Sequence, residues 1–235
     1  ATRLTISEDD EGEPTMQVNV LYRPSQTIAQ CWLADGEALM AESGAMMGMT
    51  TNVAMQTQSG GVLKGLKRMF GGESFFRNTF TAQGGQGEVL LTTPLCGDMA
   101  VLDVGQRQWC LQNSAYVGSS TTVDVSTQAS GRGFFSGAGL FILGTQGQGQ
   151  LLIGSFGALE PLTVDGSMVL DTGHLVAWEA SLQYSIGKSG SGWIASYLSG
   201  EGLVCHFEGQ GQVYVQSRNT AEYGSTIGNM LPPAG

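Results

Sequence analysis

The tripeptide Gly-Gln-Gly occurs three times in this chain of 235 residues, and the copies are evenly spaced. The copies start at Gly85, Gly147 and Gly209, so each lies 62 residues after the one before it. A short apolar or alternating stretch follows every copy, at 88–91, 150–153 and 212–215. Self-similarity at a fixed period indicates repeated structural units. The sequence therefore predicts a chain built from similar modules.

A second shared element precedes each Gly-Gln-Gly copy. An apolar stretch leads to a turn at Gly36, Gly105 or Gly173, and a second apolar stretch follows. Asp and Gly favour such turns, because Asp caps local backbone groups and Gly adopts positive φ. Each second stretch ends near a serine, namely Ser43, Ser114 and Ser181.

Short strands separated by glycine turns predict an all-β fold. We expect one compact domain over residues 1–235, made of three repeated short β-sandwich or double-stranded β-helix-like modules. The modules should cover approximately 14–93, 94–160 and 161–225 and be related by a pseudo-threefold axis. Residues 1–13, with five acidic side chains, form an acidic lead-in, and residues 226–235 form a tail.

The one helix that the sequence predicts lies near residues 61–70. Its apolar face would consist of Val62, Leu63, Leu66, Met69 and Phe70. Four of the ten basic residues of the chain fall within 64–77, and glycine N–H groups at a helix start can bind an anion. We predict an exposed anion- or partner-binding surface here; the alternative is a solvated helix face with glycine caps. Its contact residues would be Lys64, Lys67, Arg68, Arg77, Gly60 and Gly61.

Charge and hydropathy limit the function classes. Twenty acidic and ten basic residues give a net charge of −10, so nucleic acid is not an expected partner. The apolar share of 41% is too high for a disordered chain, and no apolar run approaches the roughly 20 residues of a transmembrane helix. The acidic N-terminus is the opposite of a secretory or mitochondrial targeting segment, which predicts a cytoplasmic protein.

A search for catalytic chemistry returns no candidate residue, metal site or cofactor site. The four cysteines are scattered without a Cys-x-x-Cys pair, which predicts free and mostly buried thiols in a reducing compartment. His174 and His206 lack the spacing of a zinc site. Half of the ten methionines fall at strand spacing, which predicts core or a subunit interface; they are Met40, Met46, Met47, Met49 and Met55.

The string from Ser59 to Phe76, together with Glu42–Met46 and the Gly-Asp and Gly-Ser turns, resembles the family of altered inheritance of mitochondria protein 24. The resemblance covers nearly the whole chain, and the glycine-, lysine- and arginine-containing string is its most specific part. It implies a β-rich fold of three repeats, similar to the ring-forming tryptophan RNA-binding attenuation protein. It implies no catalytic activity and no catalytic residues. Mitochondrial relatives are implicated in inner-membrane organisation, and we expect that role not to transfer, because the N-terminus does not resemble a presequence.

These observations predict a non-enzymatic oligomeric scaffold or interaction protein. Its partners would be further copies of itself, with a trimer as the expected assembly, and an unidentified protein or anionic partner. The alternative, by fold analogy, is a ring-forming RNA- or small-ligand-binding protein. Few bases are available for the continuous positive groove that single-strand binding needs.

Overall fold

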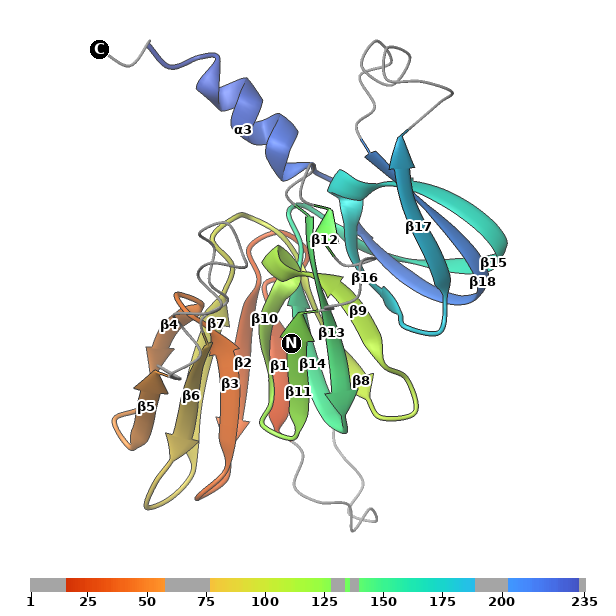
Figure 1. The fold of residues 1–235 in the computed structure, drawn as a ribbon. Helices are drawn as coiled ribbons and strands as arrows, with labels where there is room; N and C mark the ends of the chain where they lie inside the picture. Colours follow the sequence, from red (N-terminus) through yellow and green to blue (C-terminus); the bar gives the residue numbers. More distant parts are fainter. Residues whose placement is uncertain (1–15, 58–76, 128–133, 136–139, 189–202, 233–235) are drawn as a thin grey trace.

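The computed structural model describes residues 16–57, 77–127, 134–135, 140–188 and 203–232, and these residues form the expected all-β fold (Figure 1). The first part of the chain contains β1 (Gln17–Leu21), β2 (Ile28–Leu33), β3 (Ala38–Glu42), β4 (Met46–Met49), β5 (Val53–Thr57), β6 (Arg77–Ala82) and β7 (Gly87–Thr92). The middle contains β8 (Met99–Val104), β9 (Trp109–Gln112), the 3-10 helix η1 (Asn113–Ala115), β10 (Tyr116–Ser120), β11 (Val123–Thr127), β12 (Phe134–Phe135), β13 (Leu140–Gly147) and β14 (Gly149–Gly154). The last part contains β15 (Leu159–Asp171), the 3-10 helix η2 (Thr172–His174), β16 (Leu175–Glu179), β17 (Gln183–Lys188), β18 (Leu203–Gln216) and the helix α3 (Thr220–Gly228).

Three antiparallel sheets contain these strands. Their orders are β1-β2-β7-β4, then β5-β6-β3-β10-β14-β8, and β11-β13-β9-β16-β18-β15 with β12 beside β13 and β17 beside β18. The pair β3·β10 and the pair β9·β16 join strands from consecutive parts of the chain. The second and third sheets therefore connect the parts that the sequence places one after another.

Alternating side chains explain why these segments are strands. In β2, Ala29, Cys31 and Leu33 are fully buried, and the residues between them are partly exposed. The same alternation of buried and partly exposed residues runs along β6 and β7. A period of two places every second side chain on one face of a sheet, so one face of each strand packs into the core.

The same pairing order occurs in each part of the chain. In the first part, β6 pairs with β3 and β5, whereas β7 pairs with β2 and β4. In the middle, β13 pairs with β9 and β11, and β14 pairs with β8 and β10. In the last part, one half of β18 pairs with β17 and the other with β16, and both halves pair with β15.

All three Gly-Gln-Gly copies lie where the chain passes from one set of strand partners to the next. The first lies at the turn from β6 to β7, the second joins β13 to β14, and the third lies within β18. Their first glycines, Gly85, Gly147 and Gly209, have φ of +136°, +103° and +116°. Glycine adopts this region without steric cost, which explains the recurrence of the tripeptide. The superposition of three modules about a common axis stays a prediction.

The turn predicted at Gly173 is the short 3-10 helix η2, which connects β15 to β16. This glycine lies in η2, where the Asp171 carboxylate accepts a hydrogen bond from its N–H at 2.7 Å. The position that corresponds to Gly36 and Gly105 is instead Gly166, a glycine inside β15 with a φ of +98° that lies opposite Gly209. The predicted correspondence of Gly173 to Gly36 and Gly105 is therefore wrong, because η2 comes one strand later in the chain, where η1 lies in the middle part. Ser181 consequently follows β16, whereas Ser43 and Ser114 follow β3 and β9.

Buried side chains form three apolar clusters, and each cluster combines residues from consecutive parts of the chain. The first is built mainly from β2 to β7 but includes Val117 and Leu152. The second surrounds β8 to β14 and includes Val176 and Ala177. The third includes Cys110 and Ile142 in addition to residues of β15 to β18.

The helix α3 follows β18 and extends away from the sheets (Figure 1). The Asn219 side chain caps it by accepting hydrogen bonds from the N–H groups of Ala221 and Glu222. The sequence analysis did not predict this helix, and the helix predicted near 61–70 lies outside the described residues. None of the helices in the described part of the chain has the length and apolarity that crossing a bilayer requires.

We expect Gly147→Ala to lower the free energy of unfolding by about 2 kcal/mol or more, for two reasons. The backbone at this position has a positive φ, which alanine adopts only at a cost, and the new Cβ would overlap the Thr122 carbonyl oxygen. Gly84→Ala has the same φ problem at +71° but open space, so it should cost about 1 kcal/mol. Gly187→Ala, with open space and no such φ, is the control and should change stability by less than about 0.5 kcal/mol. Urea denaturation followed by circular dichroism measures all three, and equal losses at the three positions would contradict the argument.

Candidate functional site

The predicted basic surface falls mostly outside the described residues. Lys64, Lys67, Arg68, Gly60 and Gly61 all lie there, so the surface stays a prediction. Arg77 is described: it begins β6, is partly buried, and lies opposite Glu42 of β3.

The surroundings of Arg77 contain buried titratable groups. Burial raises the pKa of Glu42 to about 7. Burial also raises the pKa of Tyr116, whereas hydrogen bonds from Ser119 and Arg77 and the charge of Arg77 act in the opposite direction. The Tyr116 hydroxyl lies 3.0 Å from Ser119 Oγ. The charge of Arg77 thus acts on the protein's own interior.

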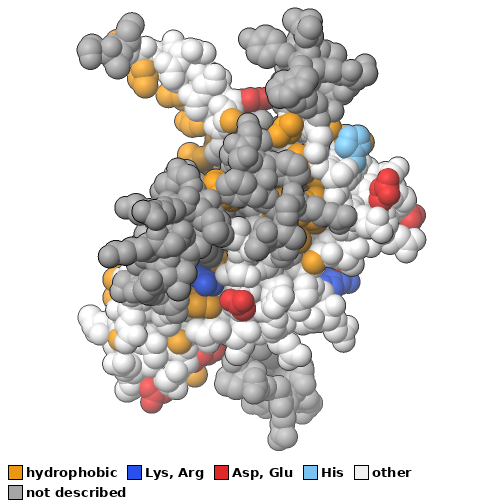
Figure 2. Space-filling view, viewed as in Figure 1, with side chains coloured by type: hydrophobic (Ala, Val, Ile, Leu, Met, Phe, Trp, Pro, Cys, Tyr) orange, Lys and Arg blue, Asp and Glu red, His pale blue; other side chains and the backbone are white. Residues whose placement is uncertain are grey.

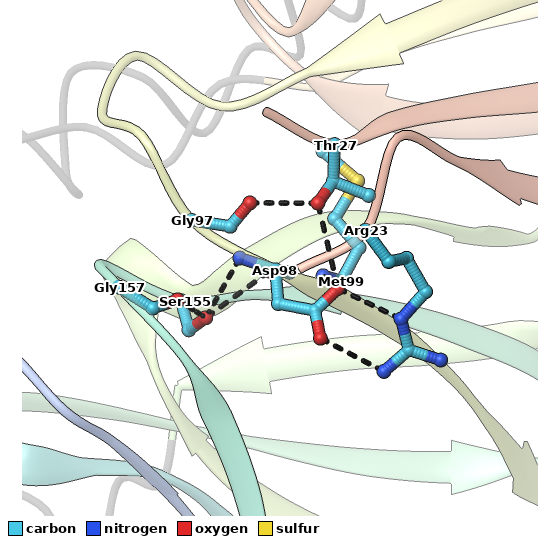
Figure 3. Close-up of polar contacts among 7 residues, drawn as sticks. All are labelled: Arg23, Thr27, Gly97, Asp98, Met99, Ser155 and Gly157. Atoms are coloured by element: carbon cyan, nitrogen blue, oxygen red, sulfur yellow. Dashed lines mark hydrogen bonds and ion pairs between the residues drawn. The ribbon is translucent and has the colours of Figure 1, made fainter. Parts of the chain in front are cut away.

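A second polar cluster, which we call the junction, consists of Arg23, Thr27, Gly97, Asp98 and Ser155 (Figure 3). The Arg23 guanidinium donates to both oxygens of the Asp98 carboxylate, at 2.9 and 2.8 Å. The Thr27 hydroxyl donates to the Gly97 carbonyl oxygen at 2.7 Å. The Asp98 N–H donates to Ser155 Oγ at 3.2 Å. The junction therefore connects the loops before β2, β8 and β15.

The junction is packed too closely for larger residues. A Cβ on Gly97 would overlap the carbonyl oxygen of Ser155, so only glycine fits there. Burial by itself raises the pKa of Asp98, but the hydrogen bonds from Arg23 and the Met99 N–H and the charge of Arg23 outweigh it. The pKa of Asp98 consequently lies below its usual value, and its carboxylate is engaged in structural contacts.

The thiols have the character of core residues. Among the four free cysteines, Cys31, Cys110 and Cys205 are buried and Cys96 is exposed, as the sequence predicted. Burial raises the pKa of Cys110 to about 11 and of Cys205 to about 12. A thiol with such a pKa is a poor nucleophile at neutral pH.

The histidines and carboxylates do not assemble into a metal site in the part of the chain that the structure describes. His174 Nδ1 lies 2.7 Å from the Gln216 carbonyl oxygen, so this ring connects η2 to β18. His206 is exposed on β18, and its neighbour Cys205 faces the core.

A cavity of about 440 Å³ opens beside the turn between β8 and β9. Asp103, Arg107, Trp109, Gln212 and Tyr214 are among its lining residues. The Trp109 ring packs edge-on against Tyr214, with ring centres 5.7 Å apart, and its Nε1–H donates to the Asp103 carbonyl oxygen at 3.0 Å.

The rim of this cavity carries charge. The Arg107 guanidinium, 59% exposed, lies 3.7 Å from the Glu179 carboxylate. Burial raises the pKa of Tyr214, and Glu179 raises it further while Arg107 lowers it. The cavity combines aromatic walls with the exposed Arg107 cation, and Asp103 belongs to its lining as well. Periodicity in the sequence did not indicate it, because its walls come from β8, β9 and β18.

Exposed apolar side chains gather on α3 and the residues after it. Hydrophobic groups line this arm in Figure 2, and no residue of α3 is buried. The Tyr223 ring contacts Phe156 edge-on at 5.1 Å and anchors the first turn. The exposed apolar residues of the arm are Tyr223, Ile227, Met230 and Leu231.

Comparisons with known proteins match nearly the whole chain. The family model described as "Mitochondrial biogenesis AIM24" matches residues 18–218. An uncharacterised protein of Streptococcus pyogenes serotype M6 is 32% identical over an alignment of 212 residues, and the match covers 85% of each chain. A crystal structure of a Streptococcus pyogenes protein is similar with a TM-score of 0.79 and 30% identity, covering 92% of this chain and 100% of that one.

We expect Asp98→Asn to lower the free energy of unfolding at pH 7 by about 2 kcal/mol, because it removes the charge that pairs with Arg23. A carboxylate with a lowered pKa contributes stability above its unfolded pKa of about 3.9, and this contribution is lost as pH falls through the folded value. The difference between variant and wild type should therefore shrink below pH 4 in urea titrations.

The control is Arg107→Gln, which removes a more distant and exposed pair and should cost less than about 0.5 kcal/mol at pH 7. If Asp98→Asn cost no more than this control, or kept its full cost below pH 3, the junction would not hold the loops together.

Proposed function

We propose that this chain, which belongs to the mitochondrial biogenesis AIM24 family, is a self-associating scaffold without enzymatic activity that binds a further protein through its C-terminal arm. We place it in the cytoplasm, where its free thiols would stay reduced.

The observation that carries this proposal is the apolar arm. Met230 is 74% exposed, and Ile227 and Leu231 are exposed beside it. Between residues 220 and 232, which are α3 and the described residues after it, Glu222 is the single charged residue. Of Ile227, Met230 and Leu231, only Ile227 lies in α3, so the apolar surface continues past the end of the helix. An exposed apolar segment of this kind typically docks in a hydrophobic groove of a partner.

The charge distribution supports a protein-binding role over RNA binding. Arg23 pairs with Asp98, Arg107 lies near Glu179, and Arg77 acts on Tyr116. Arg23 and Arg77 are thus directed at the protein's own acidic or phenolic groups, whereas Arg107 stays largely exposed beside Glu179. Single-stranded nucleic acid would need a positive groove with stacking aromatics.

A light-scattering measurement at micromolar concentration tests the self-association. We expect a mass that is a multiple of 24.7 kDa, with three copies as the expected number. The combined variant Ile227→Ser, Met230→Ser, Leu231→Ser should keep this mass but lose the protein that the wild type cross-links in its native cell. A wild-type mass near 24.7 kDa would refute the scaffold, and unchanged cross-linking by the variant would refute the role of the arm.

The cavity beside Trp109 favours a second candidate function, the binding of a small planar anion. A panel of aromatic carboxylates should then include compounds that raise the melting temperature of the wild type by several degrees. Arg107→Gln should abolish the increase, because it removes the exposed cation at the rim. Equal shifts in both proteins, or none in the wild type, would contradict this function.

A further inference from the structure

Strands β4, β10 and β16 share one irregularity. Each has an extra residue in its pairing on one side, with β7, β14 or the C-terminal half of β18. Such a bulge is a defined feature of a strand and marks its place in a sheet. The three strands therefore hold the same place in the pairing order. Their extra residues are Met47, Val117 and Val176.

On the other side, β10 and β16 each pair with a strand from the preceding part of the chain. Ser119, two residues after the bulge of β10, lies opposite Met40 of β3. Trp178, two residues after the bulge of β16, lies opposite Cys110 of β9. All four residues are buried. This contact closes the interior between consecutive parts of the chain.

The corresponding side of β4 has no strand beside it within the described residues, where β4 ends the four-stranded sheet. Met49, two residues after its bulge, is 39% exposed, and Met47 is exposed as well. Proteins usually protect a free strand edge with charge or proline, and β4 has neither.

A second strand edge, which could pair with that of β4, occurs in the last part of the chain. Residues 167–171 of β15 pair with β18 on one side and, in the described part of the chain, end the eight-stranded sheet on the other. Cys110 pairs with Gly144, which lies three residues before the second Gly-Gln-Gly copy. Val169 pairs with His206, which lies three residues before the third copy. Val169 thus holds the place of Cys110, yet it is 56% exposed.

We infer that β4 of one copy pairs, antiparallel, with residues 167–171 of β15 in a second copy. The two internal contacts determine the register: Met49 lies opposite Val169, and Gly48 lies opposite Leu170. This pairing buries the exposed apolar side chains of both edges and satisfies backbone hydrogen-bonding groups along them.

The partner is a second copy because one chain cannot make this contact alone. Strands β4 and β15 lie at opposite ends of the molecule (Figure 1). Each copy therefore offers one edge to each of two neighbours, a head-to-tail contact that builds a ring where the rotation between copies closes. The inference rests on the proposed self-association and specifies its interface.

Mixing two proteins that each carry one introduced exposed cysteine tests the contact, because a disulfide between these two cysteines must join two chains; the buried Cys31, Cys110 and Cys205 are kept. One protein carries Met49→Cys and the other Val169→Cys, both with the exposed Cys96 changed to serine. Opposed residues of neighbouring strands have Cα atoms 4.5–5.5 Å apart, within the range of a disulfide. We expect a 49-kDa product on a non-reducing gel under mild oxidation at micromolar concentration.

The matched control replaces Met49→Cys by Met55→Cys, which is similarly exposed but lies on β5. We expect at least tenfold less product from this mixture. Equal yields from the two mixtures, or none from either, would overturn the register and the interface.

Val169→Asp provides a second readout without cysteines. The side chain is exposed in the single chain, so the variant should fold and keep the wild-type circular dichroism spectrum, while light scattering shows the mass fall to that of one chain. An oligomeric wild type with an oligomeric Val169→Asp variant would refute this interface and leave the scaffold intact. A wild type that is already monomeric would refute both.

Discussion

Two strand pairs, β3 with β10 and β9 with β16, join consecutive parts of the chain into shared sheets, and the core depends on them. The first apolar cluster contains Val117 of β10, and the second contains Val176 and Ala177 of β16. Each cluster thus needs side chains that the next part of the chain supplies. Separation of either strand pair would expose two strand edges and open an apolar cluster. The parts of the chain are therefore expected to fold cooperatively, as units that cannot bury their faces alone.

The junction provides hydrogen-bond partners for backbone groups in the loops between consecutive parts of the chain. The chain crosses from one part to the next near Gly97 and near Ser155, where backbone groups leave the ladders and need other partners. Asp98 N–H donates to the Gly157 carbonyl oxygen, and Ser155 N–H donates to the Asp98 carbonyl oxygen, both at 3.0 Å. The Asp98 carboxylate adds the pair with Arg23. In a chain with only 13% charged residues, a buried carboxylate at this position is therefore a specific structural element.

The sequence predicted those features that depend on local geometry. Positive φ at Gly147 and Gly209 explains why the Gly-Gln-Gly spacing indicated turns, and the alternation in β2 explains the strand prediction. It failed where one local signal occurs twice: Asp165-Gly166 and Asp171–Gly173 both carry the Asp and Gly of a turn, and only the first corresponds to the turns at Gly36 and Gly105. Strand pairing distinguishes them, because Gly166 lies opposite Gly209, and pairing is not visible from spacing.

Contacts between residues far apart in the chain could not be predicted from the sequence. Arg23 and Asp98 are 75 positions apart, and no periodic pattern connects them. The cavity beside Trp109 likewise joins β9 to β18. The helix α3 lacked a signal for a different reason: no residue of it is buried, so it has no apolar stripe of the kind that core packing imposes.

The position of α3 relative to the junction explains how an exposed helix can have a fixed direction. Ser217 N–H donates to the Ala158 carbonyl oxygen at 3.0 Å, and Arg218 N–H donates to that of Phe156 at 3.2 Å. Tyr223 then packs on the Phe156 ring. The base of the arm is therefore attached to the loop that carries Ser155 and Gly157, while Ile227 and the residues after it stay exposed. A helix held at its first turn and free beyond it presents an apolar surface at a defined place, and it does so without using the edges of β4 or β15. The proposed self-association and the proposed partner binding would then use separate surfaces of one molecule.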